Sequence, residues 1–260
     1  MRIVDVHAHY EDDRYNEDKQ EILNRQFANG VEYIINAGAG IESSKGALDI
    51  ANSYQNIYCT IGIHPQYVEE GEKVEDLRNL YVENNCSKIV AIGEIGLDYH
   101  YTKEFKEEQK RLFKEQLEFA YEVGLPVQIH SRDASIDTLE VLESTDKKPD
   151  KIMFHCFDLN EQTAKYIKEK GYKISIGGNV TYKRTEAAIR VIKEMPIENI
   201  MTETDSPYLS PAPHRGERNE SLNIAYVIKK IAEIKEMDVQ QVEQIVYNNA
   251  VEFYGLESKK

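Results

Sequence analysis

The first residues with evident chemistry are His7 and His9, which end a short apolar run at residues 3–6. Alternate side chains of a strand share one face, so both imidazoles would point the same way. Two imidazoles on one face form a bidentate ligand for a divalent metal ion. Such a pair is also common as an ordinary surface or core feature. It gains weight here because the chain repeats the same arrangement of an apolar run followed by a ligand-type residue.

Several other ligand-type residues follow apolar runs: His64, Glu94, His130, His155 and Asp205. If the runs are parallel strands, their carboxyl ends lie on the face where α/β barrel enzymes build active sites. Imidazoles and carboxylates gathered there can hold two divalent ions, which lower the pKa of a bound water to about 7. The pattern therefore predicts a two-metal hydrolytic site.

Two neighbouring residues have open roles. His64 lies in the sequence Gly62-Ile-His-Pro65, which suits a rigid turn. We expect it to orient a ligand or to contact a substrate phosphate rather than to bind metal. Glu203 shares a strand face with Asp205, two residues later, so it either orients a ligand or assists as one, or makes a structural hydrogen bond.

Apolar, β-branched runs alternate with helical periodicity along the whole chain. The predicted strands are residues 3–6, 31–36, 57–61, 89–92, 127–129, 152–154, 172–176 and 200–202. The predicted helices are residues 18–28, 43–54, 74–84, 104–123, 134–142, 160–170 and 186–194. Eight such units favour an α/β fold of the TIM-type (β/α)8 barrel class over an open sheet. We expect one domain over residues 1–260, with additional C-terminal helices at 222–235 and 239–254 packed against the barrel.

Composition limits the class of protein. The chain is 41% hydrophobic and 30% charged, and its net charge of −14 argues against a broad basic surface for nucleic acid. A local phosphate site built around metal ions is compatible with that charge. The first predicted strand leaves no room for a signal peptide, and no apolar run reaches the roughly 20 residues of a membrane span. Cys59, Cys86 and Cys156 lack paired spacing and read as reduced thiols, so we expect a cytoplasmic enzyme without membrane association.

Six ordered blocks contain most of the residues named so far. They are Asp5-Val-His-Ala-His9, Gly62-Ile-His-Pro65, Gly93-Glu-Ile-Gly-Leu-Asp-Tyr99, Val127-Gln-Ile-His-Ser-Arg132, His155-Cys-Phe157 and Thr202-Glu-Thr-Asp-Ser-Pro-Tyr208. Together they resemble the TatD family of metal-dependent hydrolases, a branch of the amidohydrolase-like barrels, over essentially residues 1–256. The resemblance implies a TIM-type barrel with a two-metal site. It assigns His7, His9 and Asp205 to one metal, His130 and His155 to the other, and Glu94 to the bridge between them. It also implies deoxyribonuclease activity, of the 3′ to 5′ exonuclease type in some members.

We therefore predict a divalent-metal-dependent hydrolase that uses Mg²⁺, Mn²⁺ or Zn²⁺ and cleaves DNA from an end. Glu94 and Asp205 would be its catalytic carboxylates, with Asp205 taking a proton from the attacking water. Arg132 and Arg215 follow strands and suit contact with phosphate, although ordinary surface charge explains each equally well.

The alternative within enzymes is an amide or ester hydrolase of the deacylase type, which the acidic charge favours slightly. A metal-dependent binding protein without turnover would lack a ligand or a base, and none is missing here. No obligatory protein partner is evident. The physiological metal, the strand preference and the oligomeric state are left open by the sequence.

Overall fold

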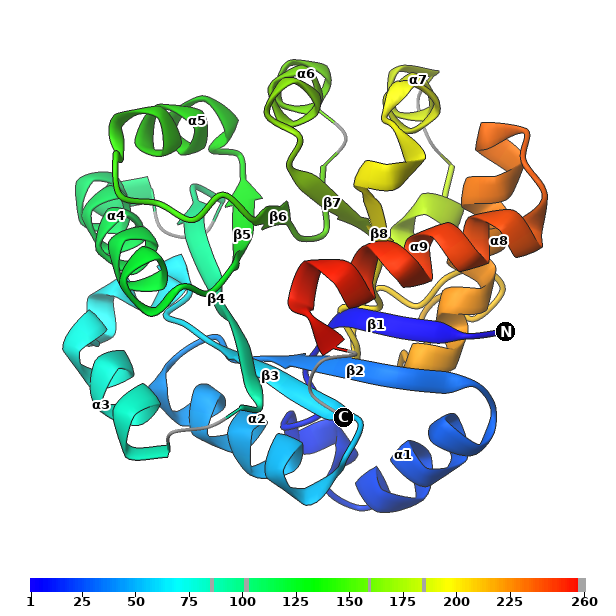
Figure 1. Ribbon diagram of the computed structural model, residues 1–260, viewed down its shortest axis with the longest axis horizontal. Helices are drawn as coiled ribbons and strands as arrows, with labels where there is room; N and C mark the ends of the chain where they lie inside the picture. Colours follow the sequence, from blue (N-terminus) through cyan, green and yellow to red (C-terminus); the bar gives the residue numbers. More distant parts are fainter. Residues whose placement is uncertain (85–86, 101–102, 159, 184–185, 257–260) are drawn as a thin grey trace.

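The computed structural model describes residues 1–84, 87–100, 103–158, 160–183 and 186–256, and its strands form one parallel sheet wound into a barrel surrounded by helices (Figure 1). The strands are β1 (Ile3–Ala8), β2 (Val31–Ala37), β3 (Ile57–Ile61), β4 (Ile89–Asp98), β5 (Val127–Arg132), β6 (Ile152–Phe154), β7 (Lys173–Ile176) and β8 (Ile200–Thr202). The helices are α1 (Lys19–Ala28), α2 (Ile41–Ser53), α3 (Val74–Asn84), α4 (Lys106–Val123), α5 (Ser135–Ser144), α6 (Glu161–Lys170), α7 (Glu186–Glu194), α8 (Ile224–Lys235) and α9 (Val239–Tyr254). The predicted TIM-type barrel with additional C-terminal helices is confirmed.

Each strand pairs in parallel with the next one along the chain, from β1 to β8. The barrel closes where β1 meets the chain that follows β8. There the Asp205 amide donates to the carbonyl of His7 at 2.9 Å, and the His9 amide donates to the carbonyl of Ser206 at 2.7 Å. The seam of the barrel therefore runs through residues that were predicted to bind metal.

The C-terminal helix α9 closes the amino-terminal end of the barrel, opposite the predicted site. The side chain of Asn249 donates to the carbonyls of Ile197 and Ile200, just ahead of and at the start of β8. On its inner face Tyr247, Phe253 and Tyr254 pack in one core cluster with inward residues of the strands. The predicted packing of this helix against the barrel is confirmed.

Some local expectations need correction. Strands β4 and β5 extend to Asp98 and Arg132, so Glu94 and His130 lie within strands rather than after them. His7 likewise lies within β1. None of the helices in the described ranges combines the length and apolar composition of a membrane span. Cys86 lies outside the described residues, so the state of the three cysteines stays a prediction.

Candidate metal centre

The six predicted ligands converge at the carboxyl end of the barrel, and four of them form two imidazole pairs. In the first pair the Nε2 atoms of His7 and His9 are 3.1 Å apart. In the second pair His130 Nδ1 is 3.3 Å from His155 Nε2. A single carboxylate, Glu94, lies between the pairs.

The two oxygens of Glu94 face different pairs. Oε2 is 3.5 Å from His7 Nε2, in the first pair. Oε1 is 2.6 Å from His130 Nδ1 and 2.8 Å from His155 Nε2, in the second. One oxygen for each pair is the arrangement a bridging carboxylate requires.

Asp205 belongs with the first pair. Its Oδ1 is 3.5 Å from His9 Nε2 and 3.8 Å from His7 Nε2. The residue has a φ of 55°, in the left-handed region that Asp tolerates better than most residues. This backbone turn, three residues after the end of β8, helps to aim the carboxylate at the first pair. The grouping is the one that the family resemblance implies, and ligation itself stays a prediction.

The donor atoms fit two divalent cations. Ligand nitrogens around a tetrahedral ion with bonds of 2.0–2.1 Å lie roughly 3.3 Å apart, close to the spacing within both imidazole pairs. Among the described residues, three sets of donor atoms, each within 4.8 Å, meet the spacing of a cation site: His7, His9 and Glu94; His7, His155 and Glu203; and His64, Glu94 and His130. Nitrogen and oxygen donors of this kind suit zinc or manganese, so the donor set supports metal binding without fixing the element.

Opposite charges compensate one another in this buried cluster. Burial raises the pKa of Glu94, but His155, His64 and His130 together hold it well below the ordinary value. Burial lowers the pKa of His155, but Glu94 and Glu203 hold it well above the ordinary value. The cluster without metal therefore keeps Glu94 ionised and His155 protonated, and metal binding at His155 must displace a proton.

Hydrogen bonds at Nδ1, on the side of each ring away from the centre, orient the rings of the first pair. His9 Nδ1 is 2.9 Å from the carbonyl oxygen of Ala37, which can only accept. Nδ1 therefore carries a proton, and Nε2, which faces the centre, is the nitrogen left to bind a metal ion. His7 Nδ1 is 2.8 Å from Gln128 Oε1, a partner that the sequence analysis did not assign. Gln128 lies two residues before His130 on the same strand face, and this spacing is the signal that could have identified it.

Carboxylates lie behind the second pair. Asp98 Oδ2 is 3.1 Å from His130 Nε2, and Asp98 is 1% exposed. The sequence analysis missed this role, although Asp98 follows Glu94 by four residues and so shares its strand face. Glu203 Oε2 is 3.5 Å from His155 Nδ1, and the same carboxylate accepts from the Cys156 amide at 2.7 Å. These contacts favour an orienting role for Glu203 over direct ligation.

His64 is close to the second pair but has the wrong tautomer for a ligand. Its Nδ1 accepts a hydrogen bond from the Gln66 amide at 3.1 Å. Burial lowers the pKa of His64 to about 3, so the ring is neutral and its proton is on Nε2. Nε2 lies 3.6 Å from Glu94 Oε1, so its N–H faces that carboxylate. The geometry favours the predicted supporting role.

The two predicted phosphate contacts lie outside this cluster. Arg132 is the exposed last residue of β5, two residues after His130. Arg215 is exposed in the segment between β8 and α8, with its guanidinium carbon 4.5 Å from the centre of the Tyr182 ring. Both positions are at the carboxyl-terminal side of the barrel, as expected, and their contact with substrate stays a prediction.

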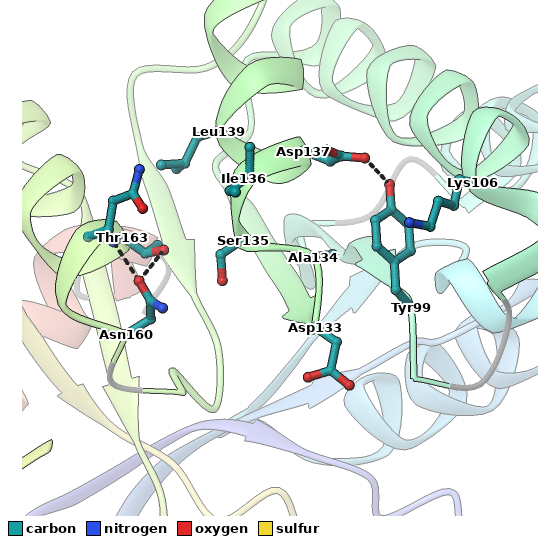
Figure 2. A pocket seen from close by; sticks show the side chains of 11 residues that line it. Tyr99, Lys106, Asp133, Ala134, Ser135, Ile136, Asp137, Leu139, Asn160 and Thr163 are labelled. Carbon is teal, nitrogen blue, oxygen red and sulfur yellow. Dashed lines mark hydrogen bonds between the residues drawn. The ribbon is translucent and has the colours of Figure 1, made fainter.

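A pocket of about 360 Å³ lies between the end of β4 and the first turns of α5 and α6 (Figure 2). Lys106 lies over the ring of Tyr99, whose hydroxyl donates to Asp137 at 2.6 Å. Ile136 is 62% exposed on the pocket wall. None of the six predicted ligands is among the described residues that line it, so this pocket is distinct from the metal centre.

Comparison with known proteins gives consistent results. Residues 4–255 match the family described as TatD related DNase. The chain is 36% identical over 254 residues to the uncharacterized metal-dependent hydrolase YabD of Bacillus subtilis, covering 98% of this chain and 99% of the relative. It is 30% identical to the uncharacterized metal-dependent hydrolase YcfH of Escherichia coli K12, covering 100% and 98%. The crystal structure of YJJV, a TatD homolog from Escherichia coli K12, superimposes with a TM-score of 0.90 at 30% identity and covers 98% of each chain.

Proposed function

Since the chain belongs to the TatD related DNase family of metal-dependent hydrolases, we propose that it is a deoxyribonuclease that removes nucleotides from a DNA end with two divalent ions. The observation that carries this proposal is the position of Glu94 between two imidazole pairs, with one oxygen toward each. Two cations held in this way suit a phosphodiester, whose reacting group is anionic and has both an attacking and a departing oxygen.

When bound, the two ions would supply Lewis acidity and lower the pKa of a coordinated water. The chain's own groups then have separate tasks. His7 and His9 would hold one ion with Asp205, and His130 and His155 would hold the other, with Glu94 shared between the two positions. Burial raises the pKa of Asp205, but His9, His155 and His7 lower it by more, so the pKa lies below its ordinary value. The carboxylate is therefore ionised and can accept the proton of the attacking water.

The surroundings of the centre support an extended substrate. Arg132 ends β5 close to His130, where a guanidinium can contact a phosphate oxygen in a bidentate manner. The pocket in Figure 2 combines apolar Ile136 and Leu139 with the polar side chains of Asn160 and Gln162, a mixture that suits a nucleotide next to the cleaved bond. DNA bound at its end needs few such contacts, which is compatible with a net charge of −14.

That same charge supports one alternative, an amide or ester hydrolase of the deacylase type at the same centre. A neutral or small substrate would not be repelled by the acidic surface, and barrels with such centres cleave several bond types. The two functions share the metal ligands and differ in the bond cleaved.

The test is hydrolysis of end-labelled single- and double-stranded DNA by protein stripped of metal and resupplied with Mg²⁺, Mn²⁺ or Zn²⁺. We expect stepwise shortening that requires metal and is lost in Glu94→Gln, a substitution that keeps the shape of the side chain and removes its charge. A matched control is Glu140→Gln, on the exposed face of α5. Folded, metal-loaded protein that leaves DNA intact would refute the nuclease and direct the search to amides and esters.

A further inference from the structure

Tyr254, the last residue of α9, is connected to the metal centre by hydrogen bonds inside the barrel. The hydroxyl of Tyr254, a residue 4% exposed, is 2.7 Å from Gln128 Nε2. Gln128 is fully buried, and its Oε1 is 2.8 Å from His7 Nδ1. One buried amide therefore connects the helix that closes the far end of the barrel to a predicted metal ligand.

The direction of each hydrogen bond in the series from Tyr254 through Gln128 to His7 is fixed by one atom that can only accept. Gln128 Nε2 is also 2.8 Å from the carbonyl oxygen of Val6, so the NH₂ group must face that carbonyl. The amide oxygen must then face His7, whose Nδ1 must donate. The lone pair of His7 Nε2 is consequently directed at the centre, where His9 Nε2 is 3.1 Å away.

Tyr254 completes the arrangement. The second amide N–H of Gln128 donates to the Tyr254 oxygen, and the Tyr254 hydroxyl donates to Met153 Sδ at 3.7 Å. With Tyr254 in place, both N–H groups of this buried amide have acceptors. Without the Tyr254 hydroxyl one amide N–H has no acceptor, and this unsatisfied donor destabilises the orientation in which the amide oxygen faces His7.

We propose that Tyr254 is a positioning residue of the metal centre, which acts through Gln128 to fix the tautomer and the ring orientation of His7. The proposal rests on the two-metal centre proposed above and is independent of the bond that the enzyme cleaves. It gives α9 a task beyond packing, because the closing helix would help set the metal affinity at the opposite end of the barrel.

The first test compares Tyr254→Phe with Tyr247→Phe. Tyr247 is a matched control because it lies on the same helix, is similarly buried, and bonds instead to Arg2 and Glu32 at the outer edge of the barrel. Loss of a group that orients a metal-binding histidine lowers metal affinity about 10–100-fold, and we expect the lower end for Tyr254→Phe. Affinity is measured by chelator competition without DNA, so failure of the nuclease proposal would leave this result unaffected.

Two further measurements separate positioning from general loosening. In metal-free protein, ¹⁵N NMR of the His7 ring should show the Nδ1–H form in the wild type and a mixture of tautomers in Tyr254→Phe. In a double-mutant cycle, Gln128→Met should weaken metal binding, and adding Tyr254→Phe should weaken it little further, because the hydroxyl acts through the amide. An unchanged His7 tautomer, additive losses, or an equal effect of Tyr247→Phe would each overturn the proposal.

Discussion

Gly96 offers a sharp test of how the barrel positions its second imidazole pair. The residue lies in β4 with a φ of 141°, and a Cβ atom added there would be 2.0 Å from the carbonyl oxygen of His130. Real Cβ contacts of this kind do not fall below 3.0 Å, so Gly96→Ala must separate β4 from β5 by about 1 Å at His130. The strained backbone costs about 1–3 kcal/mol. The forced contact adds about 1–3 kcal/mol. A displacement of 1 Å at a reacting centre lowers the rate about 100-fold.

The matched control is Gly124→Ala. Gly124 also has a left-handed φ, of 69°, but nothing lies within 4 Å of its added Cβ, so only the backbone term of about 1–2 kcal/mol applies. We expect Gly96→Ala to lower the melting temperature by on the order of 10 °C, and the control by about 4 °C. Gly96→Ala alone should weaken metal binding at the second pair, measured by chelator competition. Equal melting temperatures and equal metal affinities in the two variants would refute the idea that close approach of β4 and β5 positions His130.

Three other outcomes are expected. Burial lowers the pKa of His9 and His155, but neighbouring carboxylates raise it well above the ordinary value. Protons therefore compete with metal at these rings, and affinity should fall about tenfold per pH unit for each proton displaced as the pH decreases. Calorimetry in two buffers of different ionisation enthalpy counts those protons, and a count of zero would contradict the assignment. Asp98→Asn should lower metal affinity about 10–100-fold because it removes the charge behind His130, whereas unchanged affinity would make Asp98 a structural residue. Ile136→Trp should fill part of the pocket in Figure 2 and raise the KM for DNA without lowering kcat or stability; an unchanged KM would exclude the pocket from substrate binding.

The sequence predicted the order and type of the elements because each β/α unit has its own local periodicity. Several bounds agree, including those of β3, β6 and α9. The extension of β4 was missed because Gly93 and Gly96 interrupt its apolar run and glycine disfavours strands. The structure supplies the reason for both glycines. An added Cβ would be 2.7 Å from the Gln128 Cβ at Gly93, and 2.0 Å from the His130 carbonyl at Gly96.

The ligand set could be predicted because strand ends in a barrel share one face. The residues that orient the ligands could not be predicted in this way. Asp98 and Gln128 become partners of His130 and His7 only through side-chain orientation inside the barrel. Periodicity assigns a face to each residue, but it does not say which neighbour on that face a side chain will touch. The extent of a single domain and the cytoplasmic location stay predictions.

Helix α4 buries two glutamines among the apolar residues of its inner face. Tyr121 on this helix is 53% exposed, while Gln109 and Gln116 are fully buried against the barrel. The amide of Gln109 accepts from the Asp98 amide at 2.9 Å and donates to the Asp98 carbonyl at 3.0 Å. The amide of Gln116 does the same for Ile63, at 2.8 and 3.0 Å.

These paired hydrogen bonds have a consequence for the site. A glutamine amide that both donates and accepts satisfies a backbone N–H and C=O much as a neighbouring strand would. Gln109 holds the residue whose carboxylate faces His130, and Gln116 holds the residue directly before His64. His64 and His130 in turn have their ring centres 4.3 Å apart. One helix thus fixes the backbone on two sides of the second imidazole pair, which explains why its buried face is polar at those two positions.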